Sequence, residues 1–131
     1  MRHVTILSVA ALALGSGAVA HPSPTYDVRP SFNRCIDSSS GVTVVVLNCI
    51  GAEYDFQDAV LNARYKGLSA RLNPKQRTVL RASQRRWLKG REAACAKDAG
   101  VGDGTLADVT RNQCMLGNLV ARIDWLNRYR P

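Results

Sequence analysis

Residues 58–95 read DAVLNARYKGLSARLNPKQRTVLRASQRRWLKGREAAC and contain two amphipathic stretches on either side of one Asn-Pro step. Apolar and aromatic residues recur every three or four positions in both stretches, as they do on one face of an α-helix. Asn73 is a good N-cap, and Pro74 suits the first helical position because the amide there is unpaired anyway. So short a connection predicts that the two helices fold back on each other as an antiparallel hairpin.

Helical spacing continues on both sides of this core stretch. The first helix is expected over about 43–72 and the second over about 74–97. After a glycine-rich break at 100–104, a third helix is expected to begin near 105 and to reach about 128. The valines at 44–46 favour a strand, which leaves the start of the first helix open. We therefore predict an all-α fold: a small three-helix domain built on an antiparallel helical hairpin, with disulfides.

The chain has four cysteines, Cys35, Cys49, Cys95 and Cys114. An even number in a small exported protein implies disulfides, and the gaps are too wide for the close pairs that a zinc site needs. Four cysteines allow three pairings. We favour Cys35–Cys49, which would staple the N-terminal segment to the first helix, and Cys95–Cys114, which would close the glycine-rich break.

The N-terminus is typical of a cleavable signal peptide. A short basic start precedes an apolar run that ends at Leu14, and Ala18-Val19-Ala20 supplies the small residues at the cleavage site. The apolar run is shorter than the roughly 20 residues that span a bilayer. A lipid anchor is not expected either, because no cysteine lies at the predicted cleavage site. We predict a signal peptide over 1–20, an extended lead-in rich in proline and serine over 21–41, and a helical domain over 42–131, in a periplasmic or secreted protein.

The sequence argues against an enzyme. Its two histidines, His3 and His21, lie in the predicted signal peptide and at the predicted new N-terminus, so a Ser-His-Asp or Cys-His arrangement inside the domain is excluded. The carboxylates of Glu53, Asp55 and Asp58 are better explained by a solvated helix face plus one buried pair. We predict no catalytic residue, no metal and no cofactor.

Two motifs stand out on the hairpin, one on each helix. They are D-x-x-L-N-x-x-Y, formed by Asp58, Leu61, Asn62 and Tyr65, and Q-R-x-W-L-x-x-R-x-x-x-C, formed by Gln84, Trp87, Arg91 and Cys95. Together with Cys49, Cys114, Arg122 and Leu126, these motifs resemble the lysozyme inhibitor LprI family of bacterial exported proteins, over about residues 35–126. The resemblance implies binding and inhibition of lysozyme for some members. Gly90 departs from the family pattern, which usually has an aromatic residue there.

The motif residues also have a structural interpretation. Asp58 and Arg91 both fall on inward faces of the predicted hairpin, where an unpaired charge is very costly. We expect these two residues to pair with each other, with Gln84, Asn62 and Tyr65 completing the hydrogen bonds. Such a pair would fix the register of the two helices.

Positive charge is concentrated in the same hairpin. The chain has a formal net charge of +8, and residues 59–91 contain ten lysines and arginines but no aspartate or glutamate. With no carboxylates interleaved, the charges repel along the helix and the hairpin carries a strong positive field. The candidate interaction surface consists of Lys75, Arg77, Arg81, Arg85 and Lys89.

Two classes of partner fit a basic exported binding protein. The first is a lysozyme, which would be inhibited by direct protein–protein contact. The second is an anionic polymer of the cell envelope, bound through the basic helical hairpin; nucleic acid is not expected in that compartment. An immunity-type binder of an exported toxin is a third, narrower option.

Common lysozymes are themselves basic, so two geometries remain open for an inhibitor. An acidic patch could meet the enzyme, with Glu53 and Asp55, or Asp103 and Asp108, as candidates. Alternatively, the basic loop 73–77 could reach into the lysozyme cleft, which works with carboxylates. The sequence does not choose between them.

Overall fold

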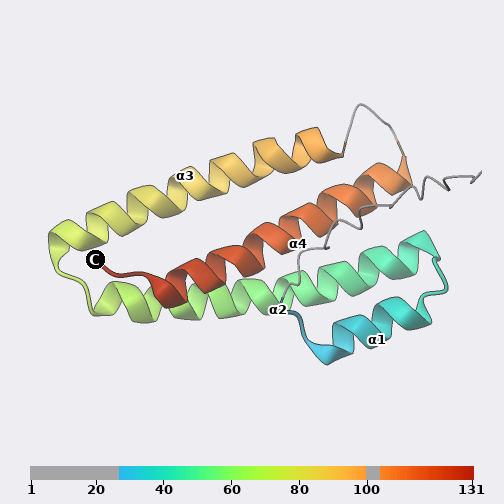
Figure 1. The fold of residues 1–131 in the computed structure, drawn as a ribbon, viewed down its shortest axis with the longest axis horizontal. Helices are drawn as coiled ribbons and strands as arrows, with labels where there is room; N and C mark the ends of the chain where they lie inside the picture. The colour runs from blue at the N-terminus through green and yellow to red at the C-terminus, as the bar shows by residue number, and fades with distance from the viewer. Residues whose placement is uncertain (1–26, 100–103) are drawn as a thin grey trace, which may run out of the picture.

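The computed structural model describes residues 27–99 and 104–131, which form four α-helices (Figure 1): α1 Pro30–Ser38, α2 Thr43–Ala70, α3 Pro74–Asp98 and α4 Thr105–Arg128. No strand occurs in these two ranges, so the predicted all-α class is confirmed. The expected signal peptide over 1–20 and residues 21–26 of the lead-in lie outside the described residues. None of the described helices is long and apolar enough to span a bilayer.

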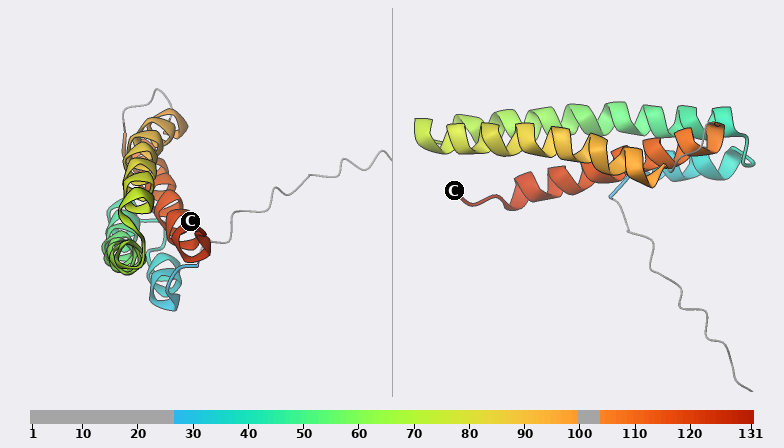
Figure 2. Two further views of the ribbon diagram at one scale, coloured as in Figure 1. Left: turned by 90° about the vertical axis from the view of Figure 1, so that its left-hand side faces the viewer. Right: turned by 90° about the horizontal axis from the view of Figure 1, so that it is seen from above.

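Helix α4 packs between the other two long helices and joins them (Figures 1 and 2). Helices α2 and α3 run in opposite directions, as the hairpin predicted, but α4 packs against both of them. Its buried apolar residues are Leu116, Leu119, Val120, Ile123 and Leu126. The third predicted helix is therefore the common packing partner of the other two long helices.

Residues 30–38 form a helix, so the expectation of an extended lead-in over 21–41 is wrong there. Pro30 occupies the first turn of α1, where its missing amide proton costs no hydrogen bond. Phe32 packs against a small core formed by Ile50, Leu116 and Val120. The lead-in thus becomes a fourth helix because it has an apolar surface to cover.

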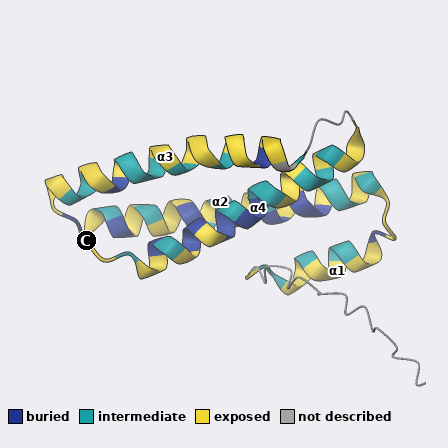
Figure 3. Cartoon of the chain, turned by 45° about the horizontal axis from the view of Figure 1, so that its top comes forward, coloured by how far each residue is buried: buried dark blue, intermediate teal, exposed yellow. Residues whose placement is uncertain are grey.

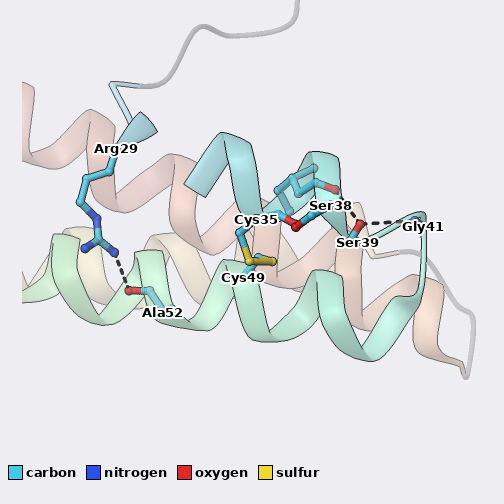
Figure 4. Close-up of a disulfide and its surroundings, with 8 residues drawn as sticks. Arg29, Cys35, Ser38, Ser39, Gly41, Cys49 and Ala52 are labelled. Atoms are coloured by element: carbon cyan, nitrogen blue, oxygen red, sulfur yellow. Dashed lines mark hydrogen bonds between the residues drawn. A yellow bond between two sulfur atoms is a disulfide. The ribbon is translucent and has the colours of Figure 1, made fainter. Parts of the chain in front are cut away.

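The turn between α1 and α2 is shaped by two residues with positive φ angles, Ser40 at 51° and Gly41 at 74°. The Ser39 hydroxyl donates to the Ile36 carbonyl at 2.7 Å and accepts from the Gly41 amide at 3.3 Å (Figure 4). Helix α2 then begins at Thr43 despite its β-branched first turn. Packing of Val46 on the small core offsets the low helix propensity of this turn.

The disulfides join Cys35 to Cys49 and Cys95 to Cys114, with Cα atoms 5.8 and 5.5 Å apart. This is the sequential pairing. The first bond ties α1 to α2 (Figure 4), and the second ties the end of α3 to α4. Both lie toward the end of the bundle that is remote from the α2–α3 turn.

Helix α3 contributes little to the core. Figure 3 shows that most of its surface is exposed, whereas α2 and α4 carry long buried faces. Its buried residues are Leu80 and Cys95. Leu80 enters the main core with residues from α2, the α2–α3 turn and α4, namely Leu61, Leu68, Leu72, Leu119, Ile123 and Leu126. Leu80 is therefore the principal apolar anchor of α3.

We predict that Leu80→Ala lowers the free energy of unfolding by about 3 kcal/mol, because truncating a fully buried leucine leaves a cavity. The adjacent Val79 is 56% exposed, so Val79→Ala should change stability by less than about 0.5 kcal/mol. Urea unfolding followed by circular dichroism measures both. Equal losses in the two variants would contradict the packing of α3 described above.

Candidate interaction surface

Two distant parts of the chain, the α2–α3 turn and the C-terminus, lie at the same end of the bundle (Figure 1). Helices α3 and α4 have 25 and 24 residues, so each is about 36 Å long at 1.5 Å per residue. Helix α4 therefore ends beside the α2–α3 turn, where Leu72 and Leu126 share the main core and Tyr129 packs on it. We call this end the basic tip, formed by Arg71, Lys75, Arg77, Arg128 and Arg130.

The backbone of the basic tip is fixed by a reciprocal cap. The Gln76 amide donates to the Asn73 side-chain oxygen at 2.9 Å, and the Asn73 amide donates to the Gln76 side-chain oxygen at 3.0 Å. Such a capping box satisfies two amides that a helix end would otherwise leave open. Leu72 is buried beneath the turn. The turn is thus preorganised, which lowers the entropic cost of binding through it.

The charge of the basic tip is almost uncompensated. Arg71, Lys75, Arg128 and Arg130 are exposed and Arg77 is half-buried. Along the described helices, residues 59–91 carry no carboxylate. On α4, Asp124 forms an i, i+4 ion pair with Arg128. An exposed ion pair of this kind is weak, so the tip keeps a strong positive field.

Aromatic side chains accompany these cations. A shallow hollow of about 370 Å³ is lined by Tyr65, Lys66, Ser69, Ala70 and Arg77. A second, of about 440 Å³, is lined by Trp125, Arg128, Tyr129 and Arg130. The Trp125 and Tyr129 rings lie 4.9 Å apart. Tyrosine, tryptophan and arginine are the residue types that most often dominate protein–protein binding energy.

The structure does not bring the whole predicted basic surface together. Lys75 and Arg77 belong to the tip. Arg81, Arg85 and Lys89 are exposed along α3, and at 1.5 Å per residue Lys89 lies about 21 Å along the helix from Lys75. They form a row along the side of the bundle that starts about one helical turn after Arg77 and leads away from the tip.

The predicted pair between Asp58 and Arg91 is wrong. Asp58 is half-buried and accepts a hydrogen bond from the Asn62 side chain on the same helix at 2.9 Å. On the α2 side, the Arg91 guanidinium carbon lies 5.9 Å from the Tyr54 ring centroid. Two buried nitrogens of Arg91, Nε and Nη1, have no hydrogen-bond partner. The packing of α4 against both helices removes the direct helix pairing that the prediction assumed.

Arg122 on α4 makes the polar connection to α3 instead. Its Nε donates to the Gln84 side chain at 3.0 Å, and its Nη2 donates to the Ser83 hydroxyl at 3.1 Å. Its guanidinium lies 3.8 Å from the Trp125 ring centroid and 5.6 Å from that of Trp87. Burial lowers the pKa of Arg122, while a charge interaction with Tyr65 acts in the opposite direction. Stacking and hydrogen bonds thus accommodate this buried cation without a carboxylate.

Trp87 is shared by two arginines, since Arg91 also stacks on its ring at 4.6 Å. Leu61 from the first motif is buried in the main core, and Tyr65 and Trp87 pack against it. The motif residues therefore have separate roles: Leu61 packs in the core, Trp87 and Arg91 belong to this arginine–aromatic cluster, and Asp58 and Asn62 bond to each other at the surface of α2.

The buried acid of α2 is Glu53, which we had expected on the surface. Its side chain is fully buried and pairs with Arg29 Nε at 2.7 Å. The Arg29 amide and the Gln57 side chain also donate to it, at 3.1 and 2.8 Å. Burial raises the pKa of Glu53, but the hydrogen bonds from Gln57 and Arg29 and the charge of Arg29 outweigh it, so this pKa lies below its ordinary value. Glu53 is unavailable to a partner.

The Arg29 region borders a further hollow of about 440 Å³ between the segment before α1, α2 and α4. Two of the polar side chains that line it, Arg29 and Gln57, are held by contacts within the fold. Arg29 also donates to the Ala52 carbonyl at 3.1 Å (Figure 4) and stacks on Phe56 at 4.0 Å. Gln57 donates to the Asp27 carbonyl at 3.2 Å. These contacts fasten the start of the described chain to α2.

Comparison with known proteins identifies one family. The sequence profile described as lysozyme inhibitor LprI matches residues 35–126. No curated protein and no solved structure matches the chain. The matched region spans both disulfides, both motifs and most of α4.

We predict that Arg122→Ala lowers the free energy of unfolding by about 2–3 kcal/mol, since it removes a stacked cation and leaves Gln84 and Ser83 unpaired. Asp58→Ala breaks one exposed hydrogen bond and should cost less than about 1 kcal/mol. Chemical denaturation compares the two variants. A larger loss of unfolding free energy for Asp58→Ala than for Arg122→Ala would contradict this assignment and would support the Asp58–Arg91 pair that the sequence suggested.

We predict that Glu53 makes stability sensitive to acid. Because its folded-state pKa is lowered, it stabilises the fold above its ordinary pKa of about 4.5, and this contribution disappears as pH falls through the folded-state value. Glu53→Gln should flatten this acid limb of a stability-against-pH curve measured by urea unfolding. Asp55→Asn, two residues away and exposed, is the matched control and should leave the acid limb in place.

Proposed function

The chain belongs to the lysozyme inhibitor LprI family, and from this membership we propose that it is an exported, non-enzymatic protein that binds and inhibits a lysozyme by direct contact. The described residues include no histidine, and no free cysteine occurs among them. They also contain no group of His, Cys, Asp or Glu suited to hold a metal ion. Inhibition through occupation of the enzyme's cleft requires none of these.

The basic tip is the surface that supports this proposal best. The alternative, an acidic docking patch, loses Glu53 to the buried pair with Arg29. Of its other members, Asp103 lies outside the described residues, and Asp55 and Asp108 are exposed on different helices. The observation that carries the proposal is the capped α2–α3 turn with exposed Lys75, at the end of the bundle where the cation-rich end of α4 shares the main core through Leu126 and Tyr129.

The chemistry of a lysozyme cleft complements such an end. Glycoside hydrolases of this kind use a pair of carboxyl groups that flank the scissile bond. Lys75 and Arg77 on the capped turn would form charge-assisted hydrogen bonds with acidic groups of the cleft. The ends of two helices would then fill the space that the polysaccharide needs. Inhibition in this way involves no bond making or breaking.

We predict that the double variant Lys75→Glu/Arg77→Glu inhibits lysozyme at least about tenfold less well than the wild type, which corresponds to about 1.4 kcal/mol of binding free energy. The measurement is clearance of a bacterial cell-wall suspension by lysozyme, titrated with the disulfide-intact mature protein. A glutamate in the first turn of α3 is favoured by the helix dipole, so the variant should keep its fold.

The matched control is Arg85→Glu/Lys89→Glu, which changes the net charge equally on the side of α3. It should inhibit nearly as well as the wild type. If the control loses as much activity as the tip variant, the contact is not the tip. If the wild-type protein binds the walls themselves and leaves the enzyme active, it is a binder of envelope polymers.

A further inference from the structure

We infer that the lysozyme bound by this protein has an acidic surface around its cleft, and that strongly basic lysozymes are poor targets. This inference rests on the proposed function and adds to it the electrostatic class of the partner. It follows from where the structure places both signs of charge.

The cations of the basic tip are free to act on a partner. Arg71, Lys75 and Arg130 are exposed, and the ion pairs found among the described residues, Arg29–Glu53 and Arg128–Asp124, involve none of them. Beyond the tip, the exposed row on α3 adds Arg81, Arg85 and Lys89. A partner that approaches the tip therefore meets positive charge first.

The carboxylates that could attract a basic enzyme are largely used inside the fold. Glu53 is buried against Arg29, Asp124 is paired with Arg128, and Asp58 accepts from Asn62. Exposed carboxylates outside these contacts include Asp27, Asp37, Asp55, Glu92 and Asp108. They are spread over the first residues before α1 and over all four helices, and none lies between residues 59 and 91.

Electrostatics then discriminates between lysozymes. Without the predicted signal peptide, which contains Arg2, the protein has 17 lysines and arginines against 10 aspartates and glutamates. With this net charge of +7, the protein and a strongly basic enzyme repel each other before the tip reaches the cleft. Complementary charge can raise association rates by orders of magnitude at low salt, whereas like charge suppresses the wrong partners. The cleft carboxylates act over a few ångströms, but the surface around the cleft acts over the Debye length. The charge of the surface around the cleft therefore decides which enzyme is bound. The catalytic groups contribute less to this choice, because lysozymes have them in common.

The test presents one lysozyme in two charge states. A strongly basic lysozyme is used either unmodified or with its lysines succinylated, and a naturally acidic lysozyme serves as a second probe in case succinylation damages the cleft. Association rates and Kd for the disulfide-intact mature protein are measured at about 10 mM and about 150 mM salt, where the Debye length is about 30 and 8 Å. We expect at least tenfold faster association with the acidic partners at low salt, decreasing with salt, and slow association with the basic enzyme that salt accelerates.

Two double variants separate local from overall charge. Lys75→Glu/Arg77→Glu should remove most of the preference for acidic partners. Arg34→Glu/Arg111→Glu changes the net charge by the same amount at exposed positions in α1 and in the first half of α4, and it should keep most of the preference. Loss of the preference in both variants would assign it to net charge alone and overturn the role of the tip.

The outcomes also distinguish this inference from the proposed function. Equal or tighter binding and inhibition of the basic enzyme would overturn the inference and leave the proposed function standing. Failure to bind or inhibit any of the three lysozymes at either salt concentration would overturn both.

Discussion

The fold depends on the apolar face of α4. Leu119 on this face is fully buried, and Leu116, Ile123 and Leu126 are nearly so. Because α4 packs on both α2 and α3, it sets the separation of these two helices. It also places Arg122 where a register-fixing ion pair between them was expected. The position of the C-terminus beside the α2–α3 turn has the same origin, since α4 must run the length of the core that it covers.

Local signals in the sequence predicted the helices well. Asn73 and Pro74 placed the start of α3 correctly, because a cap depends on residues within one turn of each other. Helix α1 was missed for the opposite reason. Its proline and serines are typical of a loop, and it is stabilised by contacts of Phe32 and Cys35 with residues far along the chain. Composition alone does not carry that information.

The polar interactions were less predictable than the helices. Helical periodicity indicates which residues share a face, but it does not identify the helix that this face meets. Asp58 was therefore paired with Arg91, while the buried acid is Glu53, whose partner Arg29 is 24 residues away. The same limit applies to the tip. Lys75 and Arg77 were foreseen from one charge run, whereas Arg128 and Arg130 join them only once α4 is known to end there.

Of the three connections between helices, two lie inside disulfide-closed loops and the third, the α2–α3 turn, does not. Each bond encloses one connection, the first between residues 35 and 49 and the second between 95 and 114. A protease that cuts once inside either loop leaves two fragments that are still covalently joined. The α2–α3 turn has no such safeguard, since a cut there separates the two disulfide-bonded halves. Under the proposed geometry, the partner covers this single vulnerable link whenever it is bound, so complex formation would also protect the inhibitor from degradation.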